Sequence, residues 1–255
     1  MKKIVLLVSV LLLWVGQAWA LTYSGSLSSA PNGGLYATSF WATSSSFSWD
    51  VSYSDQTGLW TYDYTWTGLT KALSHIIVQV SDTFDEINIY DGTTASYELD
   101  NFVPGSSNPG IPDDIYGLKF ETSGDPTTYD FTIVTDRAPM WGNVYAKDGV
   151  ENVGNGNNKI DVYAYNTGFA LVPPVFDPFT GVSLLSEPTF APNVVQYGPV
   201  FTSTTGVNYG WALVPDTVNG GGGGGGQFVV PEPGTFILVG AGLVGLALLR
   251  RKQGR

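Results

Sequence analysis

Large apolar and small polar residues alternate most clearly between residues 47 and 67. Phe47, Trp49, Val51 and Tyr53 alternate with Ser and Asp, and the aromatic residues at 60, 62, 64 and 66 alternate with Thr and Asp. Residues 55–58, Asp-Gln-Thr-Gly, separate the two halves with turn-forming chemistry. Period-two patterning on both sides of a turn predicts an antiparallel hairpin whose aromatic faces coincide.

Other segments predict further strands at residues 73–80, 116–122, 127–135, 140–147 and 159–165. Residues 86–90 and 95–99 suggest a second hairpin around Asp91-Gly92, a dipeptide typical of tight turns. Residues 123–126 also have strong turn chemistry. About nine short strands without an amphipathic helix favour an all-β, antiparallel β-sandwich, because paired sheets let each sheet bury one face.

Residues 171–215 differ in composition from the strand-rich part of the chain. Seven prolines interrupt residues 171–215, so we expect extended loops with short edge strands such as 194–197 and 208–214. Seven consecutive glycines follow at 220–226, and their backbone freedom predicts a flexible linker over residues 220–229. The ectodomain is therefore expected at residues 21–219, and the remaining C-terminal segment spans 230–255.

The N-terminus has the three parts of a secretory signal peptide. Lys2 and Lys3 precede an apolar run over residues 4–15, and Ala18-Trp19-Ala20 forms a small-x-small cleavage pattern. We predict export through the Sec translocon and cleavage after Ala20, so that residues 1–20 do not belong to the fold.

The C-terminus also has three parts in order. Pro231-Glu232-Pro233 precedes an uncharged apolar run, and Arg250, Arg251 and Lys252 follow it. The predicted transmembrane helix, residues 235–249, would be about 22 Å long, which is short for a hydrocarbon core of about 30 Å. The basic tail would stay cytoplasmic and act as the membrane stop, which places the ectodomain outside.

This order resembles the PEP-CTERM sorting domain of Gram-negative bacteria, in the Pro-Glu-Pro triplet and in the terminal basic patch. The resemblance implies recognition by an exosortase, a membrane peptidase, at Pro231, Glu232 and Pro233. It also implies an inner-membrane intermediate that is processed and delivered to the cell surface or extracellular matrix. Residues 139–149 are similar to a segment of other PEP-CTERM surface proteins without assigned function. A plain membrane anchor is the alternative.

Charge restricts the partners of the ectodomain. Between the predicted signal peptide and Pro231 there are 21 acidic and five basic residues, a net charge of −16. Such a body repels nucleic acid, whose binding requires Lys and Arg against phosphates. It suits neutral polysaccharide or divalent cations. The chain has no Cys, so neither disulfides nor a thiol nucleophile are available.

Candidate chemistry in the ectodomain is sparse. His75 is the only histidine, and its place in an apolar run favours a strand residue with a hydrogen-bonded imidazole over a catalytic one. No spacing singles out a pair of carboxylates, so we expect no enzyme, although a polysaccharide hydrolase with paired carboxylates stays open. Oxygen-rich residues also suggest a calcium loop, for which an ordinary solvated turn is the alternative: Asp148, Asn155, Asn157 and Asp161.

Aromatic residues offer two hypotheses. Those of the first hairpin, with Trp41, form either one core face or a sugar-stacking platform, and a sheet that buries one face favours the core. Trp141, Tyr145 and Trp211 are expected in loops, where exposed rings are harder to explain by packing. With the biofilm setting that the resemblance implies, the expected function is a binding or structural role in a polysaccharide matrix, without a cofactor.

Overall fold

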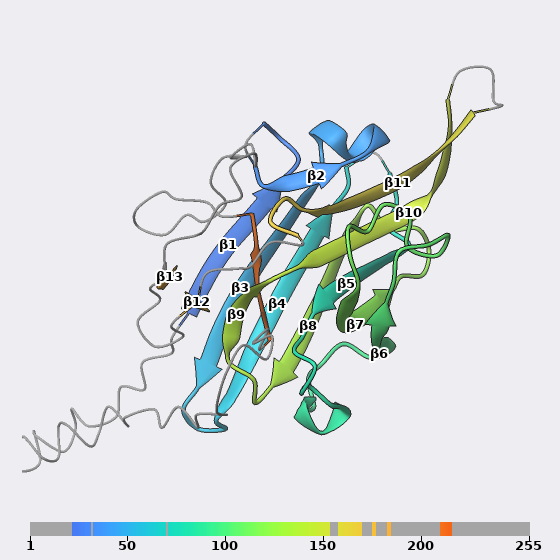
Figure 1. Ribbon diagram of the computed structural model, residues 1–255. Coiled ribbons are helices and arrows are strands. Elements are labelled where there is room, and N and C mark those ends of the chain that lie inside the picture. The colour runs from blue at the N-terminus through green and yellow to red at the C-terminus, as the bar shows by residue number, and fades with distance from the viewer. Residues whose placement is uncertain are drawn as a thin grey trace, which may run out of the picture. The chain divides into compact units, whose positions relative to one another are not determined.

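Most of the described chain belongs to two antiparallel sheets. The computed structural model describes residues 22–31, 33–69, 71–153, 158–169, 175–176, 183–184 and 210–215. The four-stranded sheet has the order β1 (Thr22–Ser28), β3 (Ser46–Ser54), β4 (Leu59–Thr67), β8 (Thr128–Thr135). The six-stranded sheet has the order β2 (Leu35–Ala37), β11 (Asn158–Asn166), β10 (Val144–Val153), β5 (His75–Gln79), β7 (Ile115–Glu121), β6 (Tyr97–Phe102). In Figure 1 the six-stranded sheet crosses in front of the four-stranded one.

Smaller elements complete the described part of the body. β9 (Pro139–Gly142) pairs with β14 (Ala212–Pro215), and β12 (Val175–Phe176) pairs with β13 (Ser183–Leu184). Two 3-10 segments, η1 (Ser39–Thr43) and η2 (Glu86–Asn88), are the helical elements of these residues. Neither is long or apolar enough to span a bilayer. The expectation of an all-β antiparallel body is confirmed.

The first hairpin matches its prediction and supplies half of the core. Ser54 pairs with Leu59 across the turn, and this register places Trp49 opposite Tyr64. The rings of Phe47 and Tyr64 stack at 5.2 Å between centroids. Full burial of each such side chain stabilises the fold by about 1.5–3 kcal/mol. The aromatic residues of this hairpin therefore form the core, and the hypothesis that they form a sugar-stacking platform is wrong.

The two sheets share one hydrophobic core. Its other half comes from alternating residues of the six-stranded sheet, including Ile76, Val78 and Phe120. The Phe120 ring of β7 lies 4.6 Å from the Phe131 ring of β8, which joins the two layers directly. Gly25 makes room for the Trp49 indole, because a Cβ there would lie 2.3 Å from its Cζ2.

The β9–β14 ribbon closes one side of this core. The Tyr64 hydroxyl donates to the Leu213 carbonyl at 2.9 Å, and Ala212, Leu213 and Val214 are fully buried. The predicted strand at 208–214 is thus present as β14, at residues 212–215. The predicted strand at 194–197 lies outside the described residues.

Asn166 fixes the corner where the chain passes from β9 to β10. Its Oδ1 accepts a hydrogen bond from the Val144 N–H at 2.8 Å. Its Nδ2 donates to Asn143 Oδ1 at 3.0 Å and to the Gly210 carbonyl at 2.6 Å. The side chain is fully buried, so these bonds satisfy backbone groups that water cannot reach. For this reason the single strand expected at 140–147 is divided in two.

The predicted hairpin at residues 86–99 is wrong. Residues 86–88 form η2, and Asp85 caps it while its N–H donates to Asn88 Oδ1 at 2.9 Å. The Tyr90 N–H donates to the Val134 carbonyl at the edge of the four-stranded sheet. Residues 97–102 instead pair with β7 in the six-stranded sheet. The two halves of the expected hairpin therefore belong to opposite sheets.

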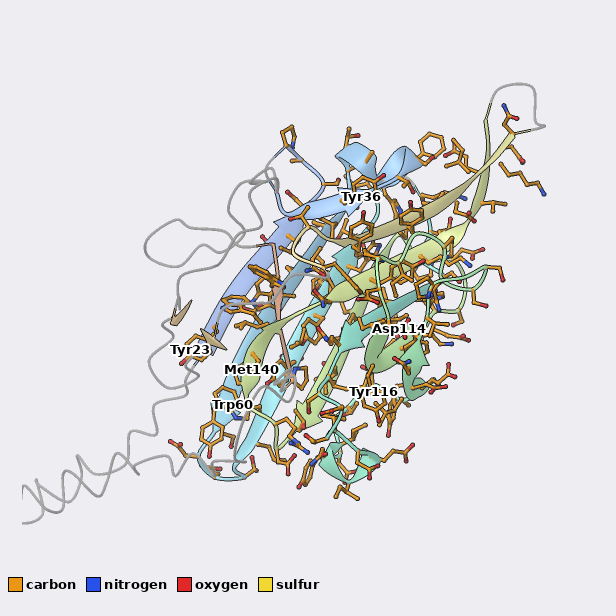
Figure 2. All side chains as sticks on the ribbon, viewed as in Figure 1. Tyr23, Tyr36, Trp60, Asp114, Tyr116 and Met140 are labelled. Carbon is orange, nitrogen blue, oxygen red and sulfur yellow. The ribbon has the colours of Figure 1, made fainter. Side chains whose placement is uncertain are left out.

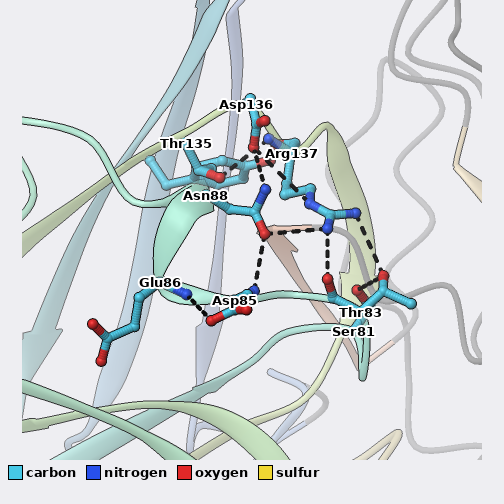
Figure 3. A network of polar contacts seen from close by, with 9 residues as sticks. Ser81, Thr83, Asp85, Glu86, Asn88, Thr135, Asp136 and Arg137 are labelled. Atoms are coloured by element: carbon cyan, nitrogen blue, oxygen red, sulfur yellow. Dashed lines mark hydrogen bonds and ion pairs between the residues drawn. The ribbon is translucent and has the colours of Figure 1, made fainter.

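Arg137 holds η2 against the end of β8 (Figure 3). Its Nη2 donates to the Thr83 carbonyl at 2.6 Å and to Asn88 Oδ1 at 3.1 Å. The Asn88 Nδ2 donates to Asp136 Oδ1 at 3.0 Å. Each partner lies on a different segment, so this network replaces the strand pairing that the sequence suggested.

The outer surface of the four-stranded sheet, here called the hydroxyl face, consists of short polar side chains. The strand registers place eighteen residues on it, and all except Leu59 and Val134 are Ser, Thr or Asp. Asp50 and Asp63 lie directly opposite each other at its centre. Hydroxyl groups orient the carboxylates: Ser24 donates to Asp50, and Thr132 donates to Asp63 at 2.7 Å.

Candidate functional site

The residues predicted to direct export and sorting lie outside the described part of the chain. This applies to Ala18 and Ala20 of the signal peptide, to the glycine linker and to the predicted transmembrane helix. It also applies to Pro231, Glu232, Pro233, Arg250, Arg251 and Lys252. These predictions stay predictions as far as the geometry is concerned.

The aromatic residues expected in loops are buried instead. Trp141 is 1% exposed, Tyr145 is fully buried and Trp211 is 7% exposed. Trp141 lies on β9 and contacts Trp49 edge-on at 6.4 Å between ring centroids. The pairing of β9 with β14 draws this region into the core, so these rings do not form an exposed platform.

Two cross-strand rows organise the outer surface of the six-stranded sheet. The first row runs from Tyr36 through Tyr165, Tyr145, Ile77 and Lys119 to Glu98, with one residue from each strand. The second row contains Tyr163, Lys147, His75 and Glu121. Both rows change from tyrosines at one end to charged side chains at the other. This gradient defines the candidate site.

Tyrosines dominate the β2–β11 end of the rows. The tyrosine cluster is defined as Tyr36, Tyr163 and Tyr165. The Tyr36 ring lies 4.9 Å from Tyr165 and 6.3 Å from Tyr163, and the Tyr163 and Tyr165 rings are nearly parallel, at 10°. Tyr36 is 45% exposed and lies near the top of the view in Figure 2. These rings thus offer a partly exposed aromatic surface with phenol groups at its edge.

Burial and neighbouring side chains raise the pKa of one phenol in the cluster. Partial burial, the adjacent Tyr36 and the Asp161 carboxylate together raise the pKa of Tyr163, with burial the largest cause. Tyr36 also shares a side-chain hydrogen bond with Tyr163. The Tyr163 hydroxyl therefore stays protonated at neutral pH and can both donate and accept hydrogen bonds.

A hollow of about 360 Å³ occupies the β6–β7 end of the rows. We call it the polar pocket. Lys119 lies in its wall and contacts the carboxylates of both Glu98 and Glu121, the latter at 3.2 Å. Its ammonium group also lies 5.3 Å from the centre of the Phe102 ring. The residues that line the pocket are His75, Glu98, Asp100, Phe102, Ser107, Asn108, Lys119, Glu121 and Lys147.

His75 forms part of the pocket wall. It lies on β5 as predicted and is 8% exposed, and its imidazole shares a hydrogen bond with Asn108. Its Nε2 has no hydrogen-bond partner among the described residues, so the expected satisfied imidazole is only half satisfied. Burial, followed by the positive charges of Lys119 and Lys147, lowers the pKa of His75 to about 4. The ring is therefore neutral at pH 7.

Residues 103–114 lie over the outer surface between the tyrosine cluster and the polar pocket. The Lys147 Nζ donates to the Ser107 carbonyl at 3.0 Å, and the Tyr145 hydroxyl donates to the Pro109 carbonyl at 2.9 Å. Gly110 covers the Tyr163 ring, with φ +72°. This loop forms one wall of the pocket and packs against the cluster, so the two parts share a structural element.

The described calcium candidates do not come together. Asp148 lies in a β-bulge of β10 and forms an ion pair of 2.9 Å with Lys71. Asp161 lies on β11 opposite Val150. Asn155 and Asn157 lie outside the described residues. Within the described part of the chain, no three His, Asp or Glu side chains are arranged to hold a metal ion.

Sequence reasoning missed the tyrosine cluster, although part of its signal is present. In β11, Asp161, Tyr163 and Tyr165 alternate with Val162 and Ala164, which predicts one polar aromatic face and one core face. The place of Tyr36 depends on the pairing of β2 with β11, between residues more than a hundred positions apart. No local sequence pattern predicts a contact between such distant residues.

Comparison with known families identifies the C-terminal segment. Residues 229–252 match the PEP-CTERM protein-sorting motif, which marks an exported, exosortase-sorted surface protein. The match contains the Pro-Glu-Pro triplet and the basic cluster, and the expectation of such a motif is confirmed. No curated protein and no solved structure matches the chain.

Proposed function

We propose that the body of this sorted protein is a non-catalytic β-sandwich module that binds neutral polysaccharide of the extracellular matrix. The observation that carries the proposal is the tyrosine cluster on the outer surface of the six-stranded sheet. Tyrosine rings supply a rigid, amphipathic contact area at low cost in conformational entropy. The apolar faces of sugar rings suit such a surface, and sugar hydroxyls suit its phenol edge.

Charge supports a neutral partner. The net charge of −16 between the predicted signal peptide and Pro231 repels acidic polymers over the whole body. Lys119 is neutralised by two carboxylates, and Lys71 by Asp148. Among the described residues, no unpaired cluster of basic side chains offers a site for an anionic chain.

Sorting supplies the setting for this binding. The motif implies processing by an exosortase and delivery to the cell surface. We further propose that the chain enters the Sec translocon through residues 1–20, pauses in the inner membrane with Arg250, Arg251 and Lys252 in the cytoplasm, and reaches the matrix after cleavage. Calcium is not needed for the proposed contact.

Affinity measurements test the proposal. Tyr36→Ala combined with Tyr165→Ala should weaken adsorption to the matrix polysaccharide roughly tenfold or more, because two stacking surfaces are lost. Tyr90→Ala is the matched control, since Tyr90 is 40% exposed but pairs with the edge of β8, outside the cluster. Equal adsorption of the double variant and the control would refute the role of the cluster.

The alternative is a polysaccharide hydrolase. Its candidate pair is Glu98 and Glu121, which both contact Lys119 at the polar pocket. Their side chains are 51% and 69% exposed, whereas a general acid in glycoside hydrolysis usually lies in an apolar environment. Release of reducing sugar by the wild type, and its loss in Glu98→Gln or Glu121→Gln, would favour this alternative over simple binding.

A further inference from the structure

We propose that the polar pocket is a subsite for one uncharged sugar residue of the glycan that lies on the tyrosine cluster. This inference rests on the proposed function. It identifies which residue of the glycan is bound outside the tyrosine cluster. Its observations are independent of the cluster: a hollow, a buried ring nitrogen without a partner and a nearly balanced set of charges.

The unpaired nitrogen of His75 points to a missing polar partner. His75 is 8% exposed, and its Nε2 has no hydrogen-bond partner among the described residues. A buried polar group without a partner costs about 1–3 kcal/mol, so such groups are rare. His75 is one of the residues that line the pocket, and a ligand hydroxyl that reached Nε2 would supply the missing partner.

The charges around the pocket favour an uncharged ligand. Glu98 and Glu121 neutralise Lys119, and Lys147 binds the carbonyls of Ser106 and Ser107. The lining holds three carboxylates, including Asp100, and two ammonium groups, so it disfavours an acidic sugar, and Glu98 and Glu121 are already paired with Lys119. Neutral sugar hydroxyls can both donate and accept hydrogen bonds. They can therefore bond to the carboxylates, the ammonium groups and the Asn108 amide of the lining.

The size of the pocket fits a single sugar ring. The volume of about 360 Å³ lies at the low end of the range for small-ligand sites. Phe102 also belongs to the lining, where it is buried beneath the Lys119 ammonium group. A hollow of this size accepts one residue at a chain end or branch, while adjacent residues continue toward the tyrosines.

The pocket and the cluster are connected through the sheet. Lys147 lies between His75 and Tyr163 in one cross-strand row, and Lys147 also binds the loop 103–114. The same strand row and the same loop therefore border both the pocket and the cluster. Polysaccharides with neutral ends or branches are the class of ligand that uses both parts.

The single histidine makes the test direct. In a full-length chain without a histidine tag, the imidazole signals in a nitrogen-correlated NMR spectrum come from His75 alone. At pH 7 we would add glucose, galactose or mannose, and separately glucuronate or glucosamine. A saturable shift of the His75 signals with at least one neutral hexose, and none with the charged sugars, is the expected result.

Variants separate this inference from the proposed function. The Tyr36→Ala, Tyr165→Ala double variant should lose polysaccharide adsorption but keep the His75 shift with free hexose. His75→Gln should adsorb polysaccharide several-fold more weakly than wild type, while Lys159→Gln, an exposed change on β11, should not.

Tyrosine-dependent adsorption without any His75 shift would overturn the subsite alone. A response only to charged sugars would overturn its uncharged class, and no adsorption at all would overturn the proposed function.

Discussion

A single imidazole couples the candidate site to pH. His75 is neutral in the folded protein because burial and two nearby lysines, Lys119 and Lys147, disfavour its protonation, against weaker opposing effects of Asn108 and Glu121. In the unfolded chain its pKa returns to about 6.5. Between pH 6.5 and about 4, the unfolded state therefore binds a proton that the folded state does not.

Stability should fall in this window as the pH falls. Linkage predicts that wild type loses about 2 kcal/mol between pH 7 and pH 5 through His75, and nothing through this group above pH 7. Denaturant unfolding at both pH values, compared with His75→Gln, isolates the effect from the carboxylates. Equal losses in both proteins would show that His75 does not carry the dependence.

Gly110 holds the loop against the tyrosine cluster. Its φ of +72° is unfavourable for other residues, and a Cβ would lie 2.0 Å from the Tyr163 ring. Gly110→Ala should therefore destabilise the fold by about 1–3 kcal/mol and move the Tyr163 ring. Thermal unfolding measures the first effect. Gly105→Ala, in the same loop with nothing within 4 Å, is the control and should be nearly neutral.

At the scale of elements, the corner between β9 and β10 depends on one amide. Asn166→Ala removes hydrogen bonds to Val144, Asn143 and Gly210 and leaves buried backbone groups unpaired. We expect a loss of about 2–4 kcal/mol in the free energy of unfolding, measured with denaturant. Asn158→Ala, an exposed change on the same strand, should cost little. Similar losses in both variants would contradict the role of the corner.

The local alternation of residues predicted most of the strands, but contacts between distant segments determined which strands pair. The hairpin of β3 and β4 was predictable because Phe47–Trp66 and Trp49–Tyr64 contacts follow from alternation around one short turn. The turn signal at Asp91-Gly92 misled, because Asp85 and Asn88 form a capping box whose bonds favour a 3-10 turn. β6 pairs with β7. Packing of the core determines this pairing, and the alternation of residues within β6 does not predict it.

The candidate site shows the same division. Tyr163 and Tyr165 could be predicted to share a face, but not to meet Tyr36 on β2. His75 could be predicted as a strand residue, but its unpaired Nε2 depends on loop 103–114 and on β7. Trp141 and Trp211 were misjudged as exposed, because β9 and β14 pair across some seventy residues of chain.

For the molecule as a whole, the sorting motif decides location. Replacing Pro231, Glu232 and Pro233 by alanine should leave the chain with its C-terminus intact in the inner membrane, because these residues are the proposed exosortase recognition element. Intact mass and fractionation of inner membrane, outer membrane and medium measure this outcome. Gln227→Ala, just outside the matched residues 229–252, is the control and should be released normally. Normal release of the triple variant would show that processing does not require the triplet.

The hydroxyl face has a consequence for crowding at the cell surface. If two copies met through it, Asp50, Asp63 and Asp130 of each would approach the same carboxylates of the other, with no lysine or arginine on that face to offset them. Their repulsion acts over roughly 8 Å at physiological ionic strength. Densely displayed copies are thus kept from associating through their hydroxyl faces.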